Sequence, residues 1–167
     1  MKKIGVIYGS TSGTCEGIAH QIAKVLAVAA IDVIDVAKIT TAQLNSYDVL
    51  LLGSSTWGFG DLQDDWYNSV NKLKAATLKE KQVGFFGCGD SDSYPDSFCD
   101  AMGLIYQEIA GSGCNIVGKL PTDGYNYDAS LAEVDGEFIG LVIDDVNDSD
   151  LTEGRIVVWA ELIKSQI

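Results

Sequence analysis

The sequence predicts a doubly wound α/β fold, in which five parallel strands form one sheet with helices on both faces. Short apolar runs alternate with helical patterns from one end of the chain to the other. The apolar runs are nearly continuous, which is typical of parallel strands covered on both faces. The 167 residues contain no internal repeat and no linker-like tract, so we expect a single domain spanning residues 1–167.

The first part of the chain predicts three strands and two helices. Lys3–Tyr8 is a short run rich in β-branched residues and predicts the first strand. A helix follows, because apolar side chains then recur at helical spacing, at Ile18, Ile22, Val25, Leu26 and Ala29. Asp32–Val36 and Val49–Leu52 predict the second and third strands. A second helical stripe comes next, at Trp66, Val70 and Leu73.

The second part of the chain continues the alternation. Val83–Phe86 predicts the fourth strand. The helix after it is indicated by an apolar stripe at Phe98, Met102, Ile105 and Ile109. The last helix is predicted to open at Asp150–Glu153, which has the spacing of a capping box, and to turn Ile156, Trp159 and Ile163 inward.

The fifth strand is predicted to be divided. Asn115–Val117 is a short apolar run, and Phe138–Ile143 is another, but the polar and glycine-rich segment Lys119–Glu137 separates them. A loop of this length inside a compact domain is usually functional or an insertion. We interpret residues 119–137 as an insertion that splits the fifth strand into two halves.

Composition and charge exclude several classes of protein. The 24 acidic and 11 basic side chains give a net charge of −13, whereas nucleic acids and anionic lipids attract basic surfaces. No segment approaches the ~20 apolar residues of a membrane span, and the N-terminal apolar run is too short for a signal peptide. The four cysteines lack C-x-x-C spacing and are typical of reduced thiols. We expect a cytoplasmic protein with no metal site, whose partners are small cofactors and basic proteins.

The segment after the first predicted strand has the character of a phosphate site. In a doubly wound fold the ligand lies at the carboxyl ends of the strands. Gly9–Glu16 combines glycines with four hydroxyl side chains and leads into a helix N-terminus, where free N–H groups attract an anion. The segment lacks the G-K-[ST] and G-x-G-x-x-G patterns of nucleotide loops. Neutral donors without a lysine suit a terminal monophosphate.

Aromatic residues follow the third and fourth predicted strands. Trp57 lies within Gly53–Asp61, among small residues, and can offer a flat face to a planar ligand. Tyr94 lies within Gly87–Pro95 and can form the opposite wall. With the hydroxyl-rich segment, these residues predict a phosphate pocket that leads into an aromatic sandwich.

These segments resemble those of the long-chain flavodoxins, and the resemblance covers essentially the whole chain. The matching stretches are Tyr8–Glu16, Thr56-Trp57 with Gly60, Leu62-Gln63 with Asp65-Trp66, Phe86–Asp90 with Tyr94, Thr122–Tyr125 and Phe138–Asp144. The resemblance implies the strand order 2-1-3-4-5 with FMN where that order reverses, a topology for which flavodoxin is itself the reference case. The insertion resembles the extra loop that separates long-chain from short-chain members.

The resemblance also implies a set of cofactor contacts. The FMN phosphate is held by Ser10 and Ser12 through hydroxyls, and mainly by backbone N–H groups at Thr11, Gly13 and Thr14. Cys15 completes this set, but the family usually has threonine there, so a weaker S–H donor replaces a hydroxyl. Trp57 and Tyr94 flank the isoalloxazine. The remaining implied contacts of the ring and ribityl chain are Ser55, Thr56, Gly58, Phe59, Gly60, Cys88, Gly89 and Asp90.

The function implied by the resemblance is electron transfer, not enzymatic catalysis. Non-covalently bound FMN shuttles single electrons at low potential between redox proteins, through the semiquinone/hydroquinone couple. In the family a backbone carbonyl just after the tryptophan turns toward the flavin N5, and here this is the Gly58–Phe59 peptide. We expect a monomer whose basic partners, of the flavodoxin reductase or oxidoreductase type, are steered by acidic side chains around the cofactor. These are Asp61, Asp64, Asp65, Asp90, Asp92 and Asp96.

The sequence leaves two alternatives open. An FMN-dependent NAD(P)H:quinone or nitro reductase shares the fold and the cofactor, and a structural FMN-binding module is the other alternative. A response-regulator receiver is excluded, because Tyr8-Gly9 and Gly53-Ser54 stand where its acidic pair and phospho-accepting aspartate belong.

Overall fold

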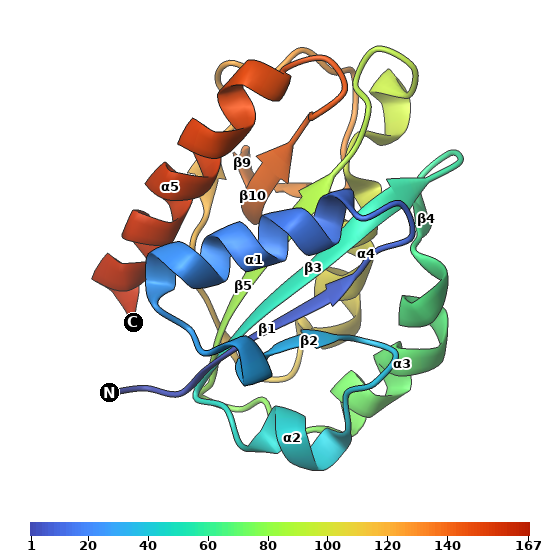
Figure 1. Ribbon diagram of the computed structural model, residues 1–167. Coiled ribbons are helices and arrows are strands. Elements are labelled where there is room, and N and C mark those ends of the chain that lie inside the picture. Colours follow the sequence, from blue (N-terminus) through green and yellow to red (C-terminus); the bar gives the residue numbers. More distant parts are fainter.

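The computed structural model describes residues 1–167 and has three layers, a twisted sheet between two layers of helices (Figure 1). The main strands are all parallel. Their order across the sheet is β2 (Val33–Asp35), β1 (Ile4–Gly9), β3 (Val49–Trp57), β5 (Gln82–Cys88) and then β6 (Asn115–Ile116) with β10 (Gly140–Ile143). Counted as five strands, this order confirms the predicted doubly wound sheet and its 2-1-3-4-5 topology.

Helices cover both faces of the sheet (Figure 1). Helices α1 (Thr14–Leu26) and α5 (Ser149–Gln166) lie on one face, and α3 (Asp64–Ala75) and α4 (Asp100–Ile109) lie on the other. The sequence analysis did not predict the short helix α2 (Thr41–Asn45), although Thr40 and Gln43 form a complete capping box at its start. Two 3-10 turns complete the helical segments, η1 (Ala30–Asp32) and η2 (Pro95–Ser97).

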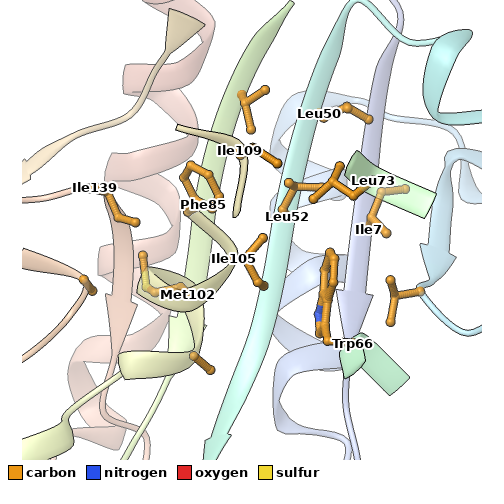
Figure 2. Packing of buried hydrophobic residues seen from close by; sticks show 14 of the residues in the cluster. Ile7, Leu50, Leu52, Trp66, Leu73, Phe85, Met102, Ile105, Ile109 and Ile139 are labelled. Carbon is orange, nitrogen blue, oxygen red and sulfur yellow. The ribbon is translucent and has the colours of Figure 1, made fainter. Parts of the chain in front are cut away.

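The core consists of two apolar clusters, one on each face of the sheet, and β3 contributes to both. Leu50 and Leu52 belong to the cluster beneath α3 and α4, whereas Val49 and Leu51 belong to the cluster beneath α1 and α5. Side chains alternate between the two faces along a strand. Figure 2 shows the first cluster, where strand residues meet Trp66 and Leu73 of α3 and Met102, Ile105 and Ile109 of α4. Burial on both faces explains the continuous apolar run.

The fifth strand is divided as predicted. Both β6 and β10 pair with the free edge of β5, β6 at Gln82–Val83 and β10 at Phe85–Cys88. The intervening insertion is not the plain loop that was predicted, because it contains a small antiparallel sheet. Its strands are β7 (Leu120–Pro121), β9 (Glu137–Phe138) and β8 (Glu133–Val134). Phe138 therefore belongs to this sheet and not to the fifth strand.

Four predicted boundaries are wrong. Ala29, predicted to belong to the first helix, lies outside α1, because Ala27 after Leu26 is left-handed and ends the helix. Strand β3 continues beyond Leu52 to Trp57 and forms a hairpin with β4 (Asp61–Leu62). Helix α4 begins at Asp100, because Cys99 before it is left-handed with φ 54°. Helix α5 begins at Ser149 after Asp148, so the predicted capping box at Asp150 does not form. No helix of the structure combines the length and the apolar character that a membrane crossing requires.

Candidate functional site

The carboxyl ends of β1, β3 and β5 meet at one edge of the sheet. The strands are parallel and in register, so Gly9 pairs with Ser54 and Ser54 with Gly87. The chain leaves β1 toward β2 on one side and returns to β3 on the other, so strand order reverses between β1 and β3. Crevices at such reversals are the usual ligand sites of doubly wound folds.

The N-terminus of α1 offers unpaired donors at this edge. Its N-cap Gly13 is left-handed with φ 95°, and no side chain caps the helix. The first intrahelical bond joins the Gly17 N–H to the Gly13 carbonyl at 2.9 Å, so the N–H groups of Thr14, Cys15 and Glu16 have no partner within the helix. The Ser10 hydroxyl accepts the Gly13 N–H at 3.2 Å and shapes the loop. This arrangement suits an anion.

A cavity of about 290 Å³ opens beside this helix end. Trp57 and Tyr94 both line it and remain 42% and 40% exposed. The residues of the lining that the sequence analysis named are Ser12, Thr14, Ser55, Thr56, Trp57, Gly58, Cys88, Gly89, Asp90 and Tyr94. The structure therefore brings residues of the α1 loop, the end of β3 and the loop after β5 together around one cavity.

The remaining predicted contacts lie beside the cavity and do not line it. They are Ser10, Thr11, Gly13, Cys15, Phe59 and Gly60. Phe59, 91% exposed at the hairpin tip, lies edge-on to Tyr94 with ring centroids 6.0 Å apart. The sequence analysis missed five lining residues, Ser97, Phe98, Cys99, Asp145 and Val146. Phe98 and Cys99 were missed because the apolar spacing of Phe98 fits a helix pattern, although Pro95 indicates a turn just before them.

The hairpin that carries Trp57 depends on glycine. The Gly60 N–H donates to the Trp57 carbonyl at 3.1 Å and closes the turn. Gly58 and Gly60 have φ of 51° and 108°, which favours glycine. The Trp57 indole donates to the Ser55 hydroxyl at 2.9 Å. The turn therefore holds the indole at the edge of the cavity through local contacts.

Cys15 does not have its predicted environment. It is fully buried on the same side of α1 as Ile18 and Ile22. A hydrogen bond with the Cys88 thiol, together with burial, raises the pKa of the Cys15 thiol well above its ordinary value. The thiol faces the protein interior, which disagrees with the prediction that its S–H donates to a phosphate. The group of Cys15 that remains free for an anion is its backbone N–H.

Two carboxylates near the cavity have shifted pKa values. The side-chain amide of Asn147 donates to Asp90 at 3.0 Å and lowers the pKa of Asp90. Burial raises the pKa of Asp100, although Asp100 accepts the Leu131 N–H at 2.7 Å. The cavity lining contains the acids Asp90 and Asp145 and no lysine or arginine, so added negative charge on a bound ring is disfavoured.

A larger hollow of about 1200 Å³ lies at the opposite end of the sheet, but its lining does not resemble that of the first cavity. It is open and has no aromatic wall. Three of its four lysines already have partners: Lys81 donates to the Asn45 and Tyr47 carbonyls, Lys2 to Gln82, and Lys164 to Glu161. The cavity at the carboxyl edge therefore suits a ligand with a planar ring and a phosphate better than this hollow does.

Comparison with known proteins agrees with this geometry. The family model described as Flavodoxin matches residues 6–159. A flavodoxin of Haemophilus influenzae is 42% identical, covering 100% of this chain and 97% of its own length. One of Helicobacter pylori is 43% identical over 98% of both chains. The Fusobacterium nucleatum flavodoxin bound to flavin mononucleotide has a TM-score of 0.91 at 30% identity, covering 100% of this chain and 99% of its own. The chain belongs to the flavodoxin family.

Proposed function

We propose that this protein is a one-electron carrier that binds FMN non-covalently in the cavity at the carboxyl edge of the sheet. The observation that carries the proposal is the unpaired N-terminus of α1 opening onto a cavity lined by Trp57 and Tyr94. When bound, the flavin supplies the redox chemistry, and the protein controls its orientation, its electrostatics and its access to partners.

The residues fit the two ends of this cofactor. The N–H groups of Thr14, Cys15 and Glu16, with nearby hydroxyls, provide neutral donors for a phosphate. The cavity of about 290 Å³ matches the lower end of ligand pockets, roughly 300 Å³, and Trp57 and Tyr94 offer aromatic surfaces to a flat ring. The acids Asp90 and Asp145 oppose added electrons on the ring, which favours a low potential.

The same proposal extends to partners and setting. Exposed acids near the cavity, including Asp61, Asp64, Asp92 and Asp96, support docking with basic-surfaced redox proteins of the reductase or oxidoreductase type. The four cysteines lack C-x-x-C spacing and are typical of reduced thiols, which supports a reducing compartment such as the cytoplasm. We propose that residues 1–167 act as a single FMN-binding domain and as a monomer.

Titration of the flavin-free protein with FMN tests the proposal. We expect quenching of FMN fluorescence with one-to-one stoichiometry, and binding of riboflavin at least tenfold weaker, because riboflavin lacks the phosphate. Stepwise anaerobic reduction of the complex should then show two separate one-electron potentials. NAD(P)H oxidation by the protein alone should stay at background. Absence of FMN binding refutes the proposal, and rapid NAD(P)H turnover with a quinone identifies a reductase instead.

A further inference from the structure

A buried carboxylate anchors the loop that carries Tyr94. Asp144 follows β10 directly and is only 1% exposed. It accepts the Ser91 N–H at 3.2 Å and the Ser91 hydroxyl at 2.5 Å. The Asn147 N–H donates to it at 3.2 Å, and the Asn147 side-chain amide lies 3.0 Å from both of its oxygens. No ion pair of the structure includes Asp144, so neutral donors alone stabilise this buried charge.

The Asn147 amide also reaches the cavity lining. Its Nδ2 donates to Asp90 Oδ1 at 3.0 Å, so one amide group lies between two carboxylates. Asp90 also holds the segment that leads to Tyr94. Its carboxylate accepts the Ser93 N–H at 3.1 Å, and its carbonyl accepts the Tyr94 N–H at 2.9 Å. A continuous set of hydrogen bonds thus runs from Asp144 through Asn147 and Asp90 to Tyr94.

We propose that Asn147, held by Asp144, is a positioning residue that orients Asp90 and Tyr94 against the flavin ring. The inference rests on the proposed function, since it assumes that the ring occupies the cavity that Asp90 and Tyr94 line. Asn147 itself does not line the cavity, whereas its neighbours Asp145 and Val146 do. Its direct link to the lining is the hydrogen bond to Asp90.

The chemistry of the amide explains why asparagine suits this position. Only a neutral side chain with two N–H bonds can bridge Asp90 and Asp144 without adding charge. An aspartate at position 147 would place three carboxylates around one point, and their repulsion would push Asp90 away. An alanine would leave both carboxylates without the bridge.

Two substitutions and a matched control test the proposal in the FMN-loaded full chain. Asn147→Ala should weaken FMN binding about fivefold or more and should change the visible circular dichroism of the bound flavin and its reduction potentials. Asn147→Asp, which keeps the size of the side chain, should weaken FMN binding further at neutral pH. Asn115→Ala is the matched control. It removes a hydrogen bond from another side-chain amide, which donates to the Glu80 carbonyl at 3.4 Å at the opposite end of the sheet, and it should change none of these quantities.

A double-substitution cycle separates positioning from a general loss of stability. In an Asp90→Ala background, Asn147→Ala should have a much smaller effect on FMN affinity, because the hydrogen bond that links Asn147 to the cavity lining is gone. Equal losses with and without Asp90 would overturn the proposal, as would flavin affinity, circular dichroism and potentials that match those of Asn115→Ala. Failure of the proposed function is distinguishable from failure of this inference, because in the first case the unsubstituted protein itself binds no FMN.

Discussion

Gly58 at the hairpin tip is the residue whose backbone freedom bears most directly on electron transfer. Its φ of 51° lies in the left-handed region, and a Cβ there would lie 2.9 Å from an Asp61 carboxylate oxygen. Valine is strained in this conformation. We propose, from the family resemblance, that the Gly58–Phe59 peptide turns toward the flavin, and a glycine lowers the steric cost of such a turn.

We therefore predict that Gly58→Val shifts at least one of the two one-electron potentials by about 60 mV, which corresponds to tenfold in a one-electron equilibrium. Gly58→Ala should give a smaller shift in the same direction, because alanine is less restricted than valine. Spectroelectrochemical titration of both FMN-loaded variants measures the effect. Potentials identical to those of the unsubstituted protein would show that this peptide is not the switch.

Asp100 predicts a specific pH dependence of stability. Burial raises the pKa of Asp100 in the folded state, so the folded protein binds this proton more tightly than the unfolded chain does. The cost of the buried charge is present above the raised pKa and disappears as the pH falls toward the unfolded value of about 3.9. Asp100→Asn keeps an oxygen for the Leu131 N–H but carries no charge.

The flavin-free Asp100→Asn variant should therefore be more stable than the unsubstituted protein at pH 7, and this advantage should shrink as the pH falls toward about 4. Urea denaturation of both proteins across this range measures the difference in free energy of unfolding. A difference that does not change with pH would mean that Asp100 acts through its hydrogen bond with Leu131 and not through its charge.

At the scale of elements, strand β3 shows what limits prediction from a sequence. Gly53–Ser55 have the composition of a turn, so the sequence analysis ended the strand at Leu52. In the structure these residues continue the sheet, because Gly53 pairs with Tyr8 and Phe86, and Ser54 pairs with Gly9 and Gly87. Pairing on both sides decides the conformation, and local composition does not. The antiparallel sheet of the insertion has the same explanation, since its strands are only two residues long.

Strand β3 also supplies a packing prediction. A Cβ on Gly53 would lie 2.0 Å from the Phe86 ring, so Gly53→Ala should destabilise the fold by about 1–3 kcal/mol through overpacking. Gly17→Ala is the matched control, because Gly17 lies in α1 with nothing within 4 Å of its Cβ position. That change should stabilise the protein by roughly 0.5–1 kcal/mol through helix propensity. Denaturation of the flavin-free variants measures both, and effects of equal sign would contradict the packing explanation.

At the scale of the whole molecule, charge is distributed unevenly between the two ends of the sheet. The exposed acids Asp64 and Asp96 lie in segments around the cavity, whereas Lys2, Lys79, Lys81 and Lys164 surround the hollow at the other end. With a net charge of −13, the molecule repels anionic partners overall. We propose that this uneven distribution of charge orients a basic partner toward the carboxyl edge of the sheet.

We predict that electron transfer to a basic haem protein slows by about tenfold or more as ionic strength rises. Asp64→Asn with Asp96→Asn should reduce this dependence. The control is Glu80→Gln with Glu161→Gln, which changes the net charge by the same amount as the first pair of substitutions. Both residues lie near the hollow, because Glu80 lines it and Glu161 pairs with Lys164, which also lines it. This control should preserve the dependence. Stopped-flow rates across salt concentrations decide the matter, and rates independent of salt would rule out steering.

The sequence by itself determined the order of strands and helices, the three segments that follow the strands, and the residue types offered to a flavin. These features depend on local periodicity and on motifs, which a linear chain displays directly. The tertiary structure alone decided that the Cys15 thiol meets the Cys88 thiol of β5, so that only the backbone N–H of Cys15 faces the anion site. It also decided that Asp144, Asn147 and Asp90 meet, because β5 and β10 are neighbours in the sheet although 53 residues separate Ser91 from Asp144. Contacts between segments so distant in sequence arise from strand pairing, which no local pattern encodes.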